Sequence, residues 1–199
     1  DCKIFVHAST SPAKLTQICA YGAPLELVPG SREDTAKAAR KAAQTTFYAS
    51  HVWHPFFYEG TKTFAYEICE QMGWRAPDTV VLPAGNGTLL LGCEIGFREL
   101  KNWGIIDHLP KLIGVQAAHC APLFEAFHNE KSTIPSQTIA EGIAIAAPLR
   151  GDQMIAAVKS TGGTFLKVSE EEIDETIKEM SMAGFFIEPT SSAVIAGLK

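Results

Sequence analysis

Residues 79–92 constrain the fold of this chain most strongly, because they are typical of a buried strand followed by a glycine turn and a helix. Gly85 and Gly87 stand in the turn. Glycine adopts backbone angles closed to other residues, and without a Cβ it lets an anion approach the main-chain N–H groups. A helix that begins near Thr88 adds unpaired amides and the positive end of its dipole. The stretch therefore predicts a β/α unit that carries a candidate anion cradle.

Two common phosphate-binding motifs are excluded at this turn. A P-loop ends in Gly-Lys-Ser/Thr, and no lysine follows Gly87 before Lys101. The dinucleotide fingerprint requires a third glycine three positions after the second, where this chain has Leu90. Glycines after a strand also serve as ordinary turns. The turn by itself therefore indicates either a phosphate site of another kind or a plain change of chain direction.

Strand-like and helix-like segments alternate along the whole chain, which predicts an α/β fold with a parallel sheet and helices packed on it. Ser31 with Asp34 and Ser169 with Glu172 form capping-box patterns at two of the helices. The expected strands are residues 3–8, 25–28, 47–49, 79–82, 111–116 and 164–168, and the expected helices are residues 11–22, 31–43, 61–72, 88–103, 122–127, 151–160 and 169–180.

The aromatic segment 53–58 marks the expected division between two parts of the chain. Residues 1–52 are predicted to belong to a small β/α domain, and residues 53–199 to a larger one. The proline and aromatic residues around His51 and His54 favour a packed loop there over a metal site, because no third ligand is spaced to join them.

Composition excludes several other classes of protein. The net charge is −5 and the 17 Lys and Arg residues are dispersed, which argues against a nucleic-acid surface. Neither an apolar run of roughly 18 residues nor a signal-peptide pattern is present, so we expect no membrane segment and a cytoplasmic location. Five cysteines without C-x-x-C spacing indicate buried thiols, with neither a disulfide framework nor a metal site.

Five short passages in this order carry a resemblance to a known family: residues 9–14, 59–63, 83–89, 139–143 and 186–193. With them the chain resembles the fold-type II pyridoxal-phosphate enzymes, the tryptophan synthase β-like group, and within it the threonine synthase-like branch. The resemblance covers nearly the whole chain. It implies the parallel-sheet, three-layer β/α units of that fold in partial form, with the cofactor in the larger domain.

The resemblance also implies which residues hold the cofactor, pyridoxal 5′-phosphate. The glycine-rich turn of that family binds the 5′-phosphate through main-chain amides, and a glycine further along lies against the pyridine ring. The related synthases often read Gly-Asn-x-Gly-Asn here, from which Thr88 and Leu89 depart. The matching positions in this chain are Gly85, Asn86, Gly87, Thr88 and Leu89 for the phosphate and Gly142 for the ring.

No catalytic residue is assigned within this chain. In the family, the lysine that forms the Schiff base lies in a Ser-x-Lys segment well upstream, followed by a Ser-x-Gly-Asn loop that grips the substrate carboxylate. Neither segment occurs here. Lys62 lies near the start of a predicted helix, but its position does not match the motif, and a solvated helix lysine is the commoner case.

The expected function is therefore that of a pyridoxal-phosphate-dependent lyase or synthase, of which this chain carries the phosphate-binding half. For a threonine synthase-like member the reaction is conversion of O-phosphohomoserine and water to threonine and phosphate. The alternatives are a dehydratase or ammonia-lyase that acts on serine, threonine or diaminopropionate, and a non-catalytic anion-binding module. The resemblance implies a small amino-acid substrate and is compatible with a homodimer.

Overall fold

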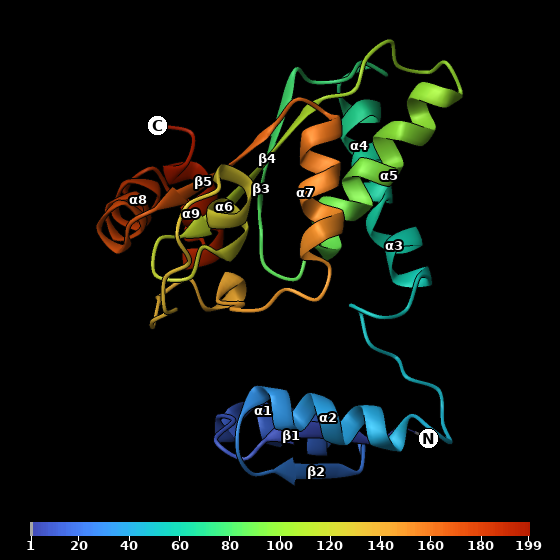
Figure 1. Cartoon of the computed structure of the whole chain (residues 1–199), viewed down its shortest axis with the longest axis vertical. Coiled ribbons are helices and arrows are strands. Elements are labelled where there is room, and N and C mark those ends of the chain that lie inside the picture. The colour runs from blue at the N-terminus through green and yellow to red at the C-terminus, as the bar shows by residue number, and fades with distance from the viewer. Residues whose placement is uncertain (1) are drawn as a thin grey trace. The chain divides into compact units, whose positions relative to one another are not determined.

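The computed structural model describes residues 2–199, apart from the side chain of Arg32. Asp1, the first residue of the expected small domain, lies outside the described residues. The chain divides into two compact units, Asp1–Trp53 and His54–Lys199 (Figure 1). Each unit is described below by itself.

The first unit is a short β-α-β-α segment. Its two strands pair in parallel, with Ile4 opposite Leu25 and His7 opposite Val28. The capping box at Ser31 is confirmed: its hydroxyl accepts the Asp34 N–H at 3.2 Å, and the Asp34 carboxylate accepts the Ser31 N–H at 2.8 Å. The elements are β1 (Ile4–His7), α1 (Pro12–Ala20), β2 (Leu25–Val28) and α2 (Arg32–Ala42).

The strand predicted at residues 47–49 is wrong. These residues follow α2 without regular structure, and the side chain of Phe47 is 74% exposed. An aromatic pair gives a short segment a preference for β structure, but that preference reflects packing on a half-buried sheet surface rather than the backbone alone. Because the side chain of Phe47 is largely exposed, it gains little of the packing that would favour a strand.

The second unit is built on a three-stranded parallel sheet in the order β3-β4-β5. Pro83 lies opposite Val115 in the first pair, and Ala117 lies opposite Val168 in the second. The elements are α3 (Phe56–Thr61), α4 (Thr63–Gln71), β3 (Thr79–Pro83), α5 (Thr88–Asn102), β4 (Lys111–Ala117), α6 (Pro122–His128), η1 (Glu141–Ile143, a 3₁₀ turn), α7 (Gly151–Ser160), β5 (Thr164–Val168), α8 (Glu170–Met182) and α9 (Pro189–Ala196).

The helix predicted over residues 61–72 is α4, and the sequence analysis missed a short helix, α3, directly before it. The chain becomes helical already at Phe56, directly after Pro55, and α3 ends at Thr61 before α4 begins. The side chain of Tyr58 is buried in the core formed with α5. Tyr58 therefore lies on the packing face of α3, whereas Phe56 and Phe57 are exposed.

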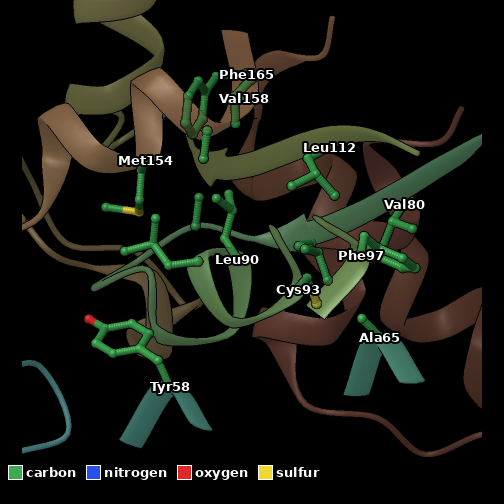
Figure 2. Packing of buried hydrophobic residues seen from close by; sticks show 14 of the residues in the cluster. Tyr58, Ala65, Val80, Leu90, Cys93, Phe97, Leu112, Met154, Val158 and Phe165 are labelled. Carbon is green, nitrogen blue, oxygen red and sulfur yellow. The ribbon is translucent and has the colours of Figure 1, made fainter. Parts of the chain in front are cut away.

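Each face of this sheet carries its own hydrophobic core. Val80, Leu82 and Phe165 pack with α5 and α7 on one face, where Figure 2 shows Leu90, Phe97 and Met154 in the same cluster. The adjacent strand residues Val81 and Leu166 point the other way, toward the core around α8 and α9. Figure 1 shows these two sets of helices on opposite sides of the sheet. The expected three-layer α/β fold with parallel strands is thereby confirmed.

Candidate cofactor-binding site

The glycine loop, residues 84–87, joins the end of β3 to the first residue of α5. Gly87 is the N-cap of that helix and has a φ of 84°, in the left-handed region that favours glycine. A Cβ at this position would lie 2.7 Å from the Cγ of Met154 and closer still to its sulfur. Backbone angle and neighbouring side chain therefore both require glycine here.

The amino end of α5 presents unpaired backbone donors to this loop. The first bond of the helix runs from the Leu91 N–H to the Gly87 carbonyl at 2.9 Å. The N–H groups of Thr88, Leu89 and Leu90 precede that bond and have no partner within the helix. None of the described side chains caps this end. Three donors and the positive end of the helix dipole thus remain for an anion.

The hydroxyl of Thr88 adds a fourth donor at the same place. Its Oγ1 is buried, and in the part of the chain that the structure describes it has no hydrogen-bond partner. A buried hydroxyl left unpaired destabilises a folded protein by about 1–3 kcal/mol, so such groups normally have a partner. A phosphate oxygen at the end of α5 would accept this hydroxyl. The residues present therefore fit the phosphate of pyridoxal phosphate.

Gly142 lies beside the glycine loop. A Cβ on Gly85 would lie 3.1 Å from the Gly142 carbonyl oxygen and 3.3 Å from the Cα of Ile143. On its other side Gly142 approaches the first turn of α9, where an added Cβ would lie 2.6 Å from the Thr190 hydroxyl. The structure thus brings Gly85, Gly142 and Thr190 together from three separate segments.

Residues 59–63 also meet the helix that begins at the loop. The Thr61 hydroxyl donates to the Thr88 carbonyl at 3.1 Å. An added Cβ on Gly92, one turn further along α5, would collide with the Thr61 side chain. Four of the five quoted passages therefore converge on the start of α5. The fifth, residues 9–14, lies in the first unit.

The remaining expected residues differ in their surroundings. Asn86 is half-buried in the loop, and Leu89 is half-buried against the core between the sheet and α5. Leu89 can contribute its backbone N–H, while its side chain serves packing. Sequence reasoning missed Thr190 as a neighbour of Gly142, although the quoted passage 186–193 contains it. It also missed Gln116, whose only signal was a polar residue inside a buried strand.

Two glutamates keep Lys62 in its charged form, which is not the form that acts as a nucleophile. Its ammonium forms ion pairs with Glu59 and, at 3.0 Å, with Glu99, and Glu99 also accepts the hydroxyl of Tyr66. The bonds to Glu59 and then Glu99 raise the pKa of Lys62 above its usual value. A nucleophilic lysine needs its pKa lowered so that the free amine is present. The network therefore supports assigning no catalytic role to Lys62.

Lys62→Met in the full-length protein is expected to leave cofactor retention unchanged, because the ion pairs of this lysine with Glu59 and Glu99 link α3 to α5. The measurement is the visible absorbance of the purified protein after gel filtration, followed by borohydride reduction and peptide mapping of the modified lysine. Recovery of the reduced cofactor on Lys62 in the unsubstituted protein would contradict this assignment. Glu99→Gln, which weakens the same bridge without touching the lysine, is the matched control.

Residues 2–199 show no sign of a metal site, a disulfide bond or a membrane-spanning helix. No group of three potential ligands among His, Cys, Asp and Glu gathers there, and no helix has the length and apolar character needed to cross a membrane. The cysteines are free thiols, and Cys69, Cys93 and Cys120 are buried. Burial raises the pKa of Cys93 to about 12, so this thiol is inert at neutral pH.

A cavity of about 510 Å³ lies apart from the glycine loop. Its described walls come from α3, α5 and α7 with their adjoining turns, and include Tyr58, Arg98 and Arg150. Arg98 is paired with Glu94, and Arg150 stacks on the Tyr58 ring at 5.4 Å. The unpaired donors at the start of α5 thus lie at the glycine loop, apart from this cavity.

The chain is similar to known proteins over most of its length. Residues 1–199 match the family described as pyridoxal-phosphate dependent enzyme. The chain is 39% identical over 192 residues to threonine synthase of Methanocaldococcus jannaschii, covering 94% of this chain and 47% of that protein. It is 36% identical over 188 residues to threonine synthase of Mycobacterium tuberculosis, covering 93% and 51%.

Solved structures share the fold at lower identity. An L-serine ammonia-lyase from Rhizomucor miehei matches with a TM-score of 0.79 and 19% identity, over 98% of this chain and 61% of its own. Threonine deaminase isoform 2 from Solanum lycopersicum matches with a TM-score of 0.78 and 21% identity, over 98% and 52%. At these identities the likeness concerns the fold alone.

The chain therefore belongs to the family of pyridoxal-phosphate dependent enzymes. It spans about half the length of the curated threonine synthases described above.

Proposed function

We propose that the full-length protein is a pyridoxal-phosphate-dependent threonine synthase that converts O-phosphohomoserine and water to threonine and phosphate. The observation that carries the proposal is the cradle at the start of α5, where free amides and the unpaired Thr88 hydroxyl fit the cofactor phosphate. The identities of 36–39% to threonine synthases across nearly the whole chain favour this reaction over others of the same class.

The residues of this chain would hold and orient the cofactor. The N–H groups of residues 88–90 and the Thr88 hydroxyl would bind its phosphate. The lack of side chains at Gly85 and Gly142 lets the loop, the 3₁₀ turn and Thr190 pack closely together, and the pyridine ring would lie beside Gly142. When bound, pyridoxal phosphate supplies an electron-withdrawing ring that stabilises negative charge at the Cα of an amino acid.

The test is a substrate comparison with the full-length protein loaded with pyridoxal phosphate. Threonine synthase activity predicts release of one phosphate and one threonine for each O-phosphohomoserine consumed. Release of ammonia and a 2-oxo acid from serine or threonine, without phosphate release, would instead establish the dehydratase or ammonia-lyase alternative. Cofactor binding with neither reaction would leave the non-catalytic anion-binding module.

We also propose a cytoplasmic location and a homodimer for the full-length protein. The location is supported by the similarity to threonine synthases, and the dimer by the family resemblance alone. Cell fractionation checks the first proposal, and sedimentation equilibrium of the full-length protein checks the second. Recovery in a membrane or secreted fraction, or a monomeric mass, would overturn the respective proposal.

A further inference from the structure

Gln116 is a fully buried polar side chain inside the central strand β4. Its carboxamide makes three hydrogen bonds to the backbone. The Nε2 group donates to the Ala84 carbonyl at 3.0 Å, and the Oε1 atom accepts the N–H groups of Leu123 at 2.9 Å and Phe124 at 3.1 Å. These partners also fix the orientation of the amide, because the reverse orientation would place two oxygens together and leave two donors unpaired.

Ala84, the first residue of the glycine loop, is bonded to β4 through both its N–H and its carbonyl group. Its N–H donates to the Val115 carbonyl at 2.9 Å, which continues the strand pairing one residue beyond Pro83. Its carbonyl accepts Gln116, the next residue on the same strand. Both peptide groups that flank Ala84 are thus fixed before the chain enters Gly85. Glycine imposes little restraint of its own, so the loop depends on this last anchored residue.

The other end of the carboxamide anchors α6. This helix begins at Pro122, and the side chain of Ala121 at its N-cap cannot accept a hydrogen bond from a backbone N–H. The Gln116 oxygen instead accepts hydrogen bonds from two first-turn N–H groups, as a capping side chain would. One buried side chain therefore joins three pieces of the site: the central strand, the entry of the glycine loop and the start of α6.

We propose that Gln116 is a positioning residue for cofactor binding, which acts by fixing the Ala84 carbonyl and through it the glycine loop. The proposal rests on the proposed function, since it requires this loop to hold the cofactor phosphate. Loss of the Nε2 donor would leave the Ala84 carbonyl buried and unpaired, so the peptide group that leads into Gly85 would lose its bond to β4. The amides of α5 and the loop would then no longer converge on one phosphate position.

The experiment compares Gln116→Glu, Gln116→Met and Thr161→Val in the full-length protein. Gln116→Glu keeps the oxygen that caps α6 and replaces the donor to Ala84, whereas Gln116→Met removes both. Thr161 is the control because its hydroxyl accepts the Leu112 N–H at 3.2 Å, at the opposite end of the same strand. Equilibrium dialysis gives the dissociation constant for pyridoxal phosphate, and urea denaturation gives the stability of each variant.

Both Gln116 variants are expected to weaken cofactor binding by about tenfold, while Thr161→Val lowers stability and leaves the dissociation constant unchanged. The carboxyl group introduced by Gln116→Glu donates only when protonated. Binding by this variant should therefore improve relative to the unsubstituted protein as the pH falls, which is a response that Gln116→Met cannot show. A purely structural role would not produce this difference between the two variants.

Three outcomes would overturn the proposal, and they are distinguishable. If the unsubstituted protein binds the cofactor and both Gln116 variants bind it equally well, the positioning role fails while the proposed function stands. A Thr161→Val variant that weakens binding as much as Gln116→Glu at equal loss of stability also overturns the positioning role. If the unsubstituted protein takes up no cofactor, the positioning role and the proposed function fail together.

Discussion

Gly87→Asp is expected to abolish cofactor retention by the full-length protein. The residue has a φ of 84°, where a side chain costs about 1–3 kcal/mol, and the added Cβ would press on Met154. The new carboxylate would stand among the free amides of α5, where it would both repel the phosphate and occupy its donors. The measurement is the visible absorbance and cofactor content of the protein after gel filtration.

Gly104→Asp is the matched control for that substitution. Gly104 follows the same helix and has a φ of 72°, but no described atom lies within 4 Å of an added Cβ. The control therefore carries similar backbone strain far from the amino end of α5. We expect it to lose stability and keep the cofactor. Normal cofactor retention by Gly87→Asp, or equal loss in both variants, would show that the cradle is assigned incorrectly.

Phe165→Ala is expected to lower the free energy of unfolding by about 3–5 kcal/mol, the range for removing a large buried aromatic side chain. Phe165 is fully buried on β5 and meets the ring of Phe127 edge-on, with 5.5 Å between ring centroids. Its ring also occupies the space that a side chain at Gly114 of the neighbouring strand would need. Urea denaturation of the full-length protein measures the loss.

Phe165→Leu provides the graded comparison. Leucine keeps most of the apolar volume and leaves a smaller cavity, so a clearly smaller loss of stability is expected. The cofactor dissociation constant should change little in the leucine variant, since Phe165 lies in the core and not at the loop. Equal losses from both substitutions would contradict this gradation, because they would mean that the apolar volume kept by leucine contributes nothing and that the ring itself carries the whole effect.

Local patterns predicted those elements whose structure depends on neighbours in the sequence. The helix at residues 151–160 and the strand at 164–168 coincide with α7 and β5, and the capping boxes at Ser31 and Ser169 form with both of their bonds. The strand expected at residues 47–49 was wrong and α3 was missed. At both places packing decided the outcome: Phe47 lies exposed, whereas Tyr58 lies buried against α5.

Some features of the candidate site likewise follow from the local sequence, whereas others depend on the tertiary structure. The turn after β3 and the helix start at Thr88 are local, since they follow from glycines placed directly after a buried strand. No local pattern shows that Gly142 approaches Gly85, that Thr190 stands behind Gly142, or that Gln116 holds Ala84. These contacts join residues dozens of positions apart in the sequence. They form only when parallel strands and their connections are brought to one edge of the sheet.

The sequence by itself determined that this chain is an α/β protein with a glycine turn between a strand and a helix, and its motifs placed it near the pyridoxal-phosphate enzymes. Backbone preference and hydrophobic periodicity are short-range properties, so they can be read without the fold. Only the tertiary structure decided that Lys62 is a paired cation, that the Thr88 hydroxyl is buried without a partner, and that Gln116 anchors the loop. Burial and pairing depend on which surfaces meet, and that is a property of the folded chain.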